Sequence, residues 1–518
     1  MRRMHITKLI CTILVSAMTG CGGDNKPIST PPPLTITTAS LLDGFVTFPY
    51  NQTIQATGGV PPYTWTVKSG TLPHNLILGS SSSNSVTISG TPDTAQSPAS
   101  FTVVITDAKD QSAAQSYSIS INSVATARLL EVPGQVPADT FEIQGLSAAS
   151  FTPSYWQKNT LNWVADVRSP IFAPLSGGQY RNIYAPWPIE MQPGGWRMFY
   201  GGWDGTDTPY DQIDSVTTDD FLQFDNRDHV IANGAFLNVN NVNVQQLSDG
   251  SFHMICTAGQ AGTDAPGKPA YFRSPDGTTW NGLPEPYSAQ LTDIISIRGY
   301  DGFDAGNFNG ANVLLRDGGT WALYFKDLND IGTTYRATTD TPPEFQFQGS
   351  VLKSQDLVND VKKLMVNGQD WYVMGLVGAD DKQSVFISLS NDGRTFDAER
   401  VLFKNDSAQD RYIVALGFVM KGTRLLGALY GAGPVESLDQ NQIFARWLQK
   451  KVLVTDSTNV QYTSDGGYGP DRQWFQVSSS PITGTLLVYA EDGVTPMASG
   501  TISITPGKAY LLVLGVDQ

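Results

Sequence analysis

Cysteine and histidine are scarce in this 518-residue sequence, which holds three cysteines and four histidines. Cys11 lies in the N-terminal leader, so Cys21 and Cys256 allow at most one disulfide in the rest of the chain. Cys256 belongs to the apolar run SFHMICTAG, and we expect a buried structural thiol there. His253 precedes Cys256 by three positions, so on a strand the two side chains point to opposite faces. This spacing argues against a catalytic Cys-His pair.

Positive charge and helical periodicity are also scarce. Charged residues make up 16 % of the chain, and the formal net charge is −15. No basic stripe is present, so we expect no nucleic acid partner. A neutral sugar polymer is compatible with this charge, and a polyanion is less so. Apolar residues at helical spacing are almost absent, whereas alternating patterns and β-branched or aromatic runs recur, which predicts an all-β chain. The 50 glycines and 31 prolines indicate a turn-rich globular protein.

The first residues have the pattern of a secretory signal. Residues 1–20 begin with basic residues and continue with an apolar run that is too short to span a bilayer. The segment SAMTGC resembles a bacterial lipobox with Met18 where leucine is usual, which implies cleavage before Cys21 and acylation of its sulfur. Ordinary cleavage and an uncleaved leader are the alternatives. Gly22 resembles the sorting rule for the outer membrane, so we expect a lipid-anchored protein of the cell envelope. Residues 21–33 form a Pro/Ser-rich tether.

Residues 34–123 show the pattern of a small β-sandwich. Short alternating strands are separated by Gly, Pro and Asp turns at a spacing of about ten residues. The segments GGVPPYTWTV, SGTLPHNLIL, ISGTPDTA and FTVVITDAKD closely resemble the He_PIG-type immunoglobulin-like repeat of bacterial surface proteins. The resemblance implies an immunoglobulin-like domain that acts as a spacer or adhesive module. We expect Trp65 in its core. Members of this family can carry calcium, but no acidic cluster of the DxNDN type is present here.

A plan of strand, Gly turn, apolar strand and third strand recurs over residues 182–450. A turn glycine marks each repeat: Gly195, Gly250, Gly319, Gly368 and Gly422. The strand after the turn is apolar or aromatic, as in WRMFYGG and TRLLGALYGAG, and third strands such as VFISLSNDGRTF follow. Self-similarity at roughly 50 to 70 residues in all-β sequence is typical of a propeller. Five repeats predict five blades around an axis.

The segments that flank the repeats are less regular. Residues 124–181 are Pro-rich, and we interpret them as a lead-in whose strands either close the last blade or pack against the C-terminal piece. In residues 451–518, the stretch VQYTSDGGYGPDRQWFQV is expected to supply a ring-closing strand. The remainder predicts a three-strand appendage. The expected fold is therefore an immunoglobulin-like sandwich, a five-bladed propeller and a small C-terminal β appendage.

The repeats contain a turn that resembles one of known enzymes. SPDGTTW (274–280) and SNDGRTF (390–396) resemble the SxDGxxW/F turn of the five-bladed glycoside hydrolases of arabinanase, xylosidase and invertase type. The order and spacing of the strands are similar as well. We interpret Asp276 and Asp392 as caps of these turns. Trp280 and Phe396 are expected to pack between blades.

The catalytic carboxylates of those enzymes do not carry over. Glycosidic hydrolysis needs one carboxylic acid and a second carboxylate. The resemblance implies an Asp in the first blade, an orienting Asp in the second and a Glu in the third. This chain has Asn182, Tyr184 and Trp187 in the first blade, Asn241 in the second and Asn309 in the third. Asparagine cannot transfer a proton, so the usual triad is incomplete.

Other acidic residues lie near the expected rim of the pocket. They are Asp204, Asp207 and Asp211 in WDGTDTPYDQ, Asp301 and Asp304 in RGYDGFDAGNFNG, Glu190, and Asp360. In one hypothesis, Asp301 or Asp304 acts as the acid and the base is Asp204 or Asp360. The alternative for each is an Asx turn or a solvated loop. A calcium site in residues 204–214 lacks a recognised ligand spacing, so we expect no metal and no cofactor.

Aromatic and amide side chains give a stronger indication of a ligand. Sugar rings stack on flat aromatic faces, and amides hydrogen-bond to hydroxyls. The aromatic candidates are Tyr184, Trp187 and Trp203. Tyr210 and Tyr300 belong to the same group of aromatics, which are expected in loops or first strands of the first and third blades. The amide candidates are Asn182, Asn241 and Asn309. A pocket built from these residues suits an uncharged extracellular glycan.

Three functions remain open from the sequence. The leading hypothesis is a surface-anchored carbohydrate-active protein with a glycoside-hydrolase-like propeller that acts on an extracellular glycan. A non-catalytic glycan-binding propeller and an adhesive surface scaffold are the alternatives. Hydrolysis predicts two carboxylates about 5 to 10 Å apart in a pocket. Glycan binding predicts an aromatic and amide-lined pocket without such a pair, and the scaffold predicts no deep axial pocket.

Overall fold

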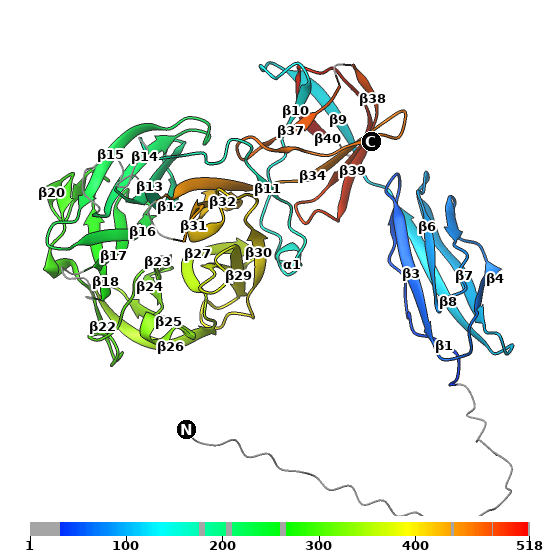
Figure 1. The fold of residues 1–518 in the computed structure, drawn as a ribbon, viewed down its shortest axis with the longest axis horizontal. Helices are drawn as coiled ribbons and strands as arrows, with labels where there is room; N and C mark the ends of the chain where they lie inside the picture. The colour runs from blue at the N-terminus through cyan, green and yellow to red at the C-terminus, as the bar shows by residue number, and fades with distance from the viewer. Residues whose placement is uncertain are drawn as a thin grey trace, which may run out of the picture. The chain divides into compact units, whose positions relative to one another are not determined.

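β-sheets, in which most strand pairs are antiparallel, make up nearly all of the regular structure of the described residues. The computed structural model describes residues 32–175, 182–203, 210–259, 266–436, 440–478 and 480–515. The chain divides into two units, residues 1–123 and residues 124–518 (Figure 1). Among the described residues, no helix is long and apolar enough to span a membrane.

The first unit is the expected β-sandwich. Its two four-stranded sheets have the orders β1-β3-β6-β5 and β2-β8-β7-β4. Their strands are β1 (Thr35–Ile36), β2 (Gly44–Phe45), β3 (Tyr50–Thr57), β4 (Thr64–Gly70), β5 (Leu76–Leu78), β6 (Ser85–Gly90), β7 (Gln96–Thr106) and β8 (Ser112–Asn122). Alternate residues of β7 are buried, as a sheet with one face on the core requires. Trp65 is 7 % exposed within this core, and its indole Nε1 donates to the Ser83 carbonyl at 3.0 Å. The prediction of a core tryptophan is confirmed.

Five sheets of the second unit form a ring (Figure 1). The innermost strands of the first to fifth blades are β12 (Ile183–Glu190), β16 (Asn238–Gln246), β23 (Asn312–Asp317), β27 (Leu357–Val366) and β31 (Tyr412–Lys421). Each of these strands contacts the next, and β31 contacts β12. The predicted five-bladed propeller is therefore present.

The outer strands follow in chain order within each blade. The second strands are β13 (Trp196–Gly202), β17 (Phe252–Gly259), β24 (Thr320–Phe325), β28 (Gln369–Val377) and β32 (Arg424–Gly433). The third strands are β14 (Gln212–Thr218), β18 (Gly267–Ser274), β25 (Thr333–Thr339), β29 (Ser384–Ser390) and β33 (Gln442–Leu448). The first, third and fourth blades have a fourth strand, which is β15 (Asp225–Ala232), β26 (Glu344–Lys353) or β30 (Arg400–Lys404) respectively. The short strands β21 (Tyr287–Ser288) and β22 (Ser296–Arg298) pair parallel with the outer edges of β15 and β26.

The strand that completes the fifth blade comes from the lead-in. Strand β11 (Trp163–Ala165) pairs antiparallel with β33, so the ring joins an early strand to a late one. Our expectation that residues 451–518 supply this strand is wrong. The stretch in question forms β35 (Gln461–Tyr462), β36 (Gly466–Gly467) and β37 (Arg472–Gln476), which belong to another sheet. The physical reason is aromatic packing there: Phe475 is fully buried and stacks on Phe141 with ring centroids 4.8 Å apart.

This other sheet makes a C-terminal domain larger than the predicted three-strand appendage. Its nine strands have the order β35-β34-β38-β39-β9-β40-β10-β37-β36. The strands not yet given are β9 (Ala125–Val132), β10 (Thr140–Gln144), β34 (Lys451–Asp456), β38 (Ile482–Tyr489), β39 (Pro496–Ile504) and β40 (Ala509–Gly515). The lead-in therefore contributes two strands to this domain and one to the propeller, so both alternatives left open for it occur.

The predicted turn signatures have structural roles. Asp276 Oδ1 accepts hydrogen bonds from the Thr278 and Thr279 amides at 2.9 and 2.7 Å, and Asp392 caps the equivalent turn of the fourth blade. Trp280 is fully buried and meets Phe199 of the first blade edge-on. Both interpretations, as turn caps and as packing between blades, are confirmed.

Glycines let neighbouring blades approach closely where the ring closes. A Cβ on Gly417, in the fifth blade, would lie 2.1 Å from the Pro186 carbonyl oxygen of the first blade. A Cβ on Gly431 would lie 2.9 Å from Tyr184 Cβ. The contact at Gly417 is with rigid backbone, so a side chain there forces the first and fifth blades apart.

We therefore predict that Gly417→Ala destabilises the propeller by about 1 to 3 kcal/mol, the usual cost of overpacking. Gly319→Ala is the matched control, because a Cβ there meets nothing within 4 Å. Urea unfolding followed by tryptophan fluorescence measures both variants. Equal midpoints for the two variants would show that the approach of the blades does not limit stability.

Candidate functional site

Backbone irregularities bring the beginnings of the inner strands together at one end of the ring. The register shifts between Tyr184 and Trp187 in β12 and between Asn240 and Asn243 in β16. Similar shifts interrupt β27 and β31 near their first residues. Bulges of this kind re-aim side chains and occur often beside binding sites. Asn241 has a φ of 52°, in the left-handed region that asparagine tolerates better than most residues.

The central cavity at this end is narrow. It is lined by residues of all five blades, among them Pro186, Asn241, Gly310, Asn359 and Ala415. Its volume is about 10 Å³, which is the lower limit for a single ordered water. A sugar ring therefore cannot enter the axis. A ligand at this end has to lie on the face of the ring.

A chain of hydrogen-bonded side chains crosses this face from the first blade to the third. The Asn240 amide Nδ2 donates to Asp211 Oδ2 at 2.7 Å, and Asn241 Nδ2 donates to Asn240 Oδ1 at 2.8 Å. Asn241 Nδ2 also lies 3.3 Å from Asn309 Oδ1. Tyr184 donates its hydroxyl to Asp211 Oδ2. We call these five residues, Tyr184, Asp211, Asn240, Asn241 and Asn309, the amide cluster.

The direction of these bonds fixes what the cluster presents. Because Asn241 uses its Nδ2 within the chain, its Oδ1 is left as an acceptor. Asn309 is exposed and accepts through Oδ1, so its Nδ2 is left as a donor. One acceptor and one donor on neighbouring amides match two adjacent hydroxyl groups of a ligand.

Asp211 is the buried end of the chain. Asp211 is 5 % exposed, and its Oδ1 is buried with no hydrogen-bond partner among the described residues. Burial raises the pKa of Asp211 to about 6, against the opposing hydrogen bonds from Asn240 and Tyr184. Among the residues that the structure describes, Asp211 supplies the one carboxyl group of the amide cluster. It therefore titrates in weakly acidic solution.

The raised pKa of Asp211 predicts how stability depends on pH. The Asp211 carboxyl group binds its proton more tightly in the folded chain than in the unfolded chain, where its pKa is near 3.8. The free energy of unfolding therefore falls as the pH rises from about 4 to about 6. Above about pH 6, the free energy of unfolding is lower by about 3 kcal/mol than it is below pH 4. We expect Asp211→Asn to remove this part of the pH dependence and to be more stable than the parent at neutral pH.

Urea midpoints measured across this pH range test the prediction. Asp301→Asn is the control, because Asp301 lies on an exposed turn. A pH profile that Asp211→Asn leaves unchanged would show that Asp211 titrates as it does in the unfolded chain.

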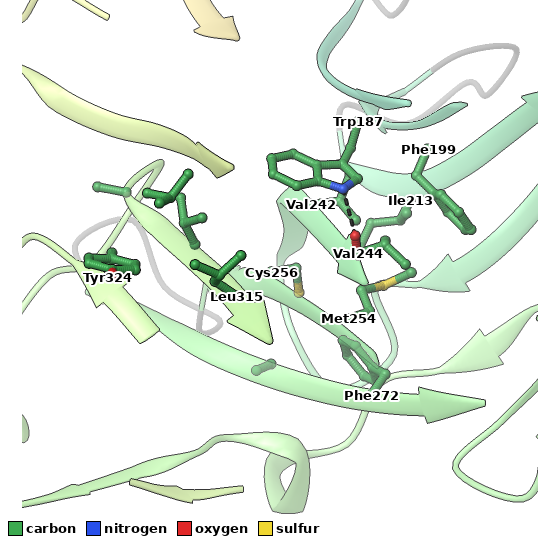
Figure 2. Close-up of a cluster of buried hydrophobic side chains, with 14 of the residues drawn as sticks. Trp187, Phe199, Ile213, Val242, Val244, Met254, Cys256, Phe272, Leu315 and Tyr324 are labelled. Atoms are coloured by element: carbon green, nitrogen blue, oxygen red, sulfur yellow. Dashed lines mark hydrogen bonds between the residues drawn. The ribbon is translucent and has the colours of Figure 1, made fainter. Parts of the chain in front are cut away.

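The axis below the face is filled by Trp187, Asp360 and Lys362, which we call the axial plug. Lys362 Nζ of the fourth blade lies 3.8 Å from the ring centroid of Trp187 in the first blade. These two blades are not neighbours, so the contact crosses the axis. Trp187 is 1 % exposed and donates its Nε1 to the Val244 carbonyl at 2.7 Å (Figure 2). Trp187 therefore offers no face to a ligand.

Asp360 is part of the same plug. Its Oδ2 lies 3.1 Å from Lys362 Nζ and accepts from the Phe418 amide of the fifth blade at 2.7 Å. Burial raises the pKa of Asp360 and lowers that of Lys362, and the attraction between the two groups opposes both shifts. The carboxylate is fully buried, so it has no access to a ligand. Asp360 therefore links the fourth blade to the fifth through its hydrogen bond with the Phe418 amide.

We predict that Lys362→Met destabilises the chain by about 3 to 5 kcal/mol, because it leaves the Asp360 charge buried and unpaired. The double variant Asp360→Asn/Lys362→Met should recover most of that loss. Thermal and urea unfolding of both variants measure this difference. A single variant as stable as the parent would contradict the role of the ion pair.

The remaining predicted residues lie apart from the cluster or outside the described chain. Asn182 is fully buried and accepts the Asn441 amide through Oδ1 at 2.7 Å, which ties β12 to the start of β33. Trp203 lines a separate cavity of about 360 Å³ on the first blade. Asp301 and Asp304 lie on an exposed turn before β23, where the Asp304 carbonyl accepts from Lys268. Asp204 and Cys21 lie outside the described residues.

The structure thus brings together three of the predicted residues, Tyr184, Asn241 and Asn309. Sequence reasoning did not select Asn240 or Asp211 for the site. The run NVNNVNV signalled an amide-rich first strand, but its alternation did not reveal which amide faces a carboxylate. The sequence did not distinguish Asp211 from the other acidic residues of the segment WDGTDTPYDQ.

A comparison with protein families agrees with the immunoglobulin-like sandwich of the first unit. The He_PIG family model, described as "Putative Ig domain", matches residues 27–122. No curated protein matches the chain.

Several solved structures that are similar to this chain are glycoside hydrolases. An exo-β-1,3-galactanase from Clostridium thermocellum has 10 % identity and a TM-score of 0.40 over 68 % of this chain and 99 % of that one. A family 117 glycoside hydrolase from Zobellia galactanivorans has 12 % identity and a TM-score of 0.39 over 56 % and 91 %. A protein of unknown function from Dyadobacter fermentans has 13 % identity and a TM-score of 0.35 over 70 % and 99 %.

Proposed function

We propose that this chain is a carbohydrate-active protein of the cell envelope whose propeller binds an uncharged extracellular glycan on the amide cluster. The observation that carries the proposal is the directed chain of amides that runs from buried Asp211 to exposed Asn309. Sugar hydroxyls both donate and accept hydrogen bonds, and protein sites recognise them with a few well-placed polar groups.

The surroundings of the cluster suit a neutral ligand. The groups offered to solvent are amides, and within the described ranges the charge hydrogen-bonded to them is that of the buried Asp211. Tyr210, 38 % exposed, directly precedes Asp211 in the chain. Exposed aromatic rings can stack on sugar rings, so Tyr210 is the aromatic candidate that lies nearest to the cluster along the chain.

Glycan binding is supported more directly than glycan cleavage. Hydrolysis needs two carboxyl groups on opposite sides of the bond. Within the described ranges, Asp211 supplies one group with a pKa suited to proton donation, and it lies below the face. A hydrolytic function would need a second carboxylate, for which Asp204, Asp301 and Asp304 are the candidates from the sequence. This hydrolase-like activity is the second candidate function.

The lipid anchor belongs to the same proposal. Acylation at Cys21 and the tether that follows would hold the two units outside the membrane, where polysaccharides are found. The lipobox-like segment and the Gly after Cys21 support this location.

We predict that Asn241→Ala weakens glycan binding about five- to tenfold, the effect of losing one well-made hydrogen bond. Calorimetric titration with neutral polysaccharides of several sugar types measures the affinity. Asn459→Ala is the matched control. Asn459 also has a positive φ and lies on a turn of the C-terminal domain, so both variants carry the same backbone strain.

Equal affinities for the two variants would contradict the role of the amide cluster. The same glycans, incubated with the parent chain and analysed for released sugars, test cleavage. If sugar release survives Asp301→Asn/Asp304→Asn but is lost in Asp211→Asn, the proton donor is Asp211 and not the turn before β23.

A further inference from the structure

A second cleft lies inside the 124–518 unit, where the propeller meets the C-terminal domain. Its volume is about 500 Å³, within the range of small-molecule sites. One wall is β11 with the residue before it, Asn162. The opposite wall is β34 with the loop that precedes β36, including Thr463 and Asp465. We call this space the junction cleft.

The two walls are held in fixed relation by Asp166, which is 3 % exposed. Its Oδ2 accepts from Trp447 Nε1 of the propeller at 2.8 Å and from the Gly469 amide of the C-terminal domain at 2.9 Å. The Val167 amide also donates to the Gly467 carbonyl at 2.9 Å. A cleft whose walls are tied in this way is preorganised, so a ligand loses little free energy in ordering it.

The charges around the junction cleft nearly cancel. Asp406 lines the cleft, and its Oδ1 lies 2.6 Å from Arg446 Nη2. Asp465 and Lys451 add one charge of each sign. Neither a polyanion nor a metal cation is favoured by such a lining, which fits an uncharged ligand.

The lining combines an aromatic ring with polar groups. Trp163 is half-buried, and its orientation is fixed by Trp156 and Phe403, whose ring centroids lie 5.9 and 5.5 Å away. Asn162 donates Nδ2 to the Gln449 carbonyl at 3.0 Å, so its Oδ1 is left as an acceptor. Thr463, which is exposed, lines the same space and brings a hydroxyl group to the lining. Aromatic surface with amide and hydroxyl groups is the chemistry that recognises a sugar.

We infer that the junction cleft is a second binding site for a neutral oligosaccharide, separate from the amide cluster. The inference rests on the proposed function, because it assumes that the two bound ligands are parts of one glycan. The residues that line the junction cleft are not members of the amide cluster. Two sites on one chain raise the overall affinity for a long polymer, because binding at the second site is intramolecular.

Calorimetric titration with short neutral pentose and hexose oligosaccharides tests the inference. We expect two sites on the parent chain. Thr463→Trp, which fills the cleft from an exposed position, should leave one site, and Gln461→Trp on the same stretch but outside the lining should leave two. Asn241→Ala should weaken the other site alone. Lys451→Ala, which adds no bulk, is a second cleft variant with an expected loss of about tenfold in affinity.

The outcomes separate the two proposals. A single site that Asn241→Ala weakens and Thr463→Trp leaves intact overturns the cleft and supports the amide cluster. A single site that Thr463→Trp removes and Asn241→Ala leaves intact supports the cleft and overturns the cluster as a binding site. If none of these sugars binds to the parent chain, both proposals fail.

Discussion

The close approach of neighbouring inner strands is the constraint on which the propeller depends. Four of the five inner strands, all except β23, are bulged near their first residues, and each bulge must fit against the neighbouring blade. Glycines provide the space: Gly201 faces the Asn240–Asn241 backbone, Gly375 faces Leu416, and Gly431 faces Tyr184. The recurrent Gly near the end of the apolar second strand is therefore a packing requirement of the ring. The same bulges carry the amide cluster, so the element that closes the ring also builds its face.

A tightly closed ring leaves a small axis, and this chain fills it with a charged pair. Desolvation of Asp360 and Lys362 is expensive, and their attraction, the Phe418 amide and the Trp187 ring offset it. The plug connects the first, fourth and fifth blades, which no single sheet does. Because the plug occupies the depth of the axis, recognition is confined to the outer face. The expectation that a saccharide sits in the hole of the ring is wrong, and the lack of a deep axial pocket in the described residues is the outcome that the scaffold alternative predicts. The proposed glycan site is a shallow one on the face of the ring.

The sequence predicted the repeating parts well and the single contacts poorly. All five inner strands and the strands after them were visible, because each repeat has the same turn and the same alternation. The closing strand β11 was not identified, since a three-residue strand carries almost no pattern. The pairing of Asp360 with Lys362 was readable in principle, because residues two apart share one face of a strand. The bond between Asp211 and Asn240 was not, because a loop and a strand from different blades meet there.

The distribution of charge connects the two proposed glycan sites. The chain has a formal net charge of −15, yet both sites are close to neutral. At the amide cluster the carboxylate is withdrawn below the face, and at the junction cleft Arg446 offsets Asp406. A surplus of acidic residues elsewhere repels polyanions from the whole surface, whereas an uncharged polymer meets no such barrier. The selection of a neutral glycan would then come from the chain as a whole, and the amides would set only the orientation of the bound sugar.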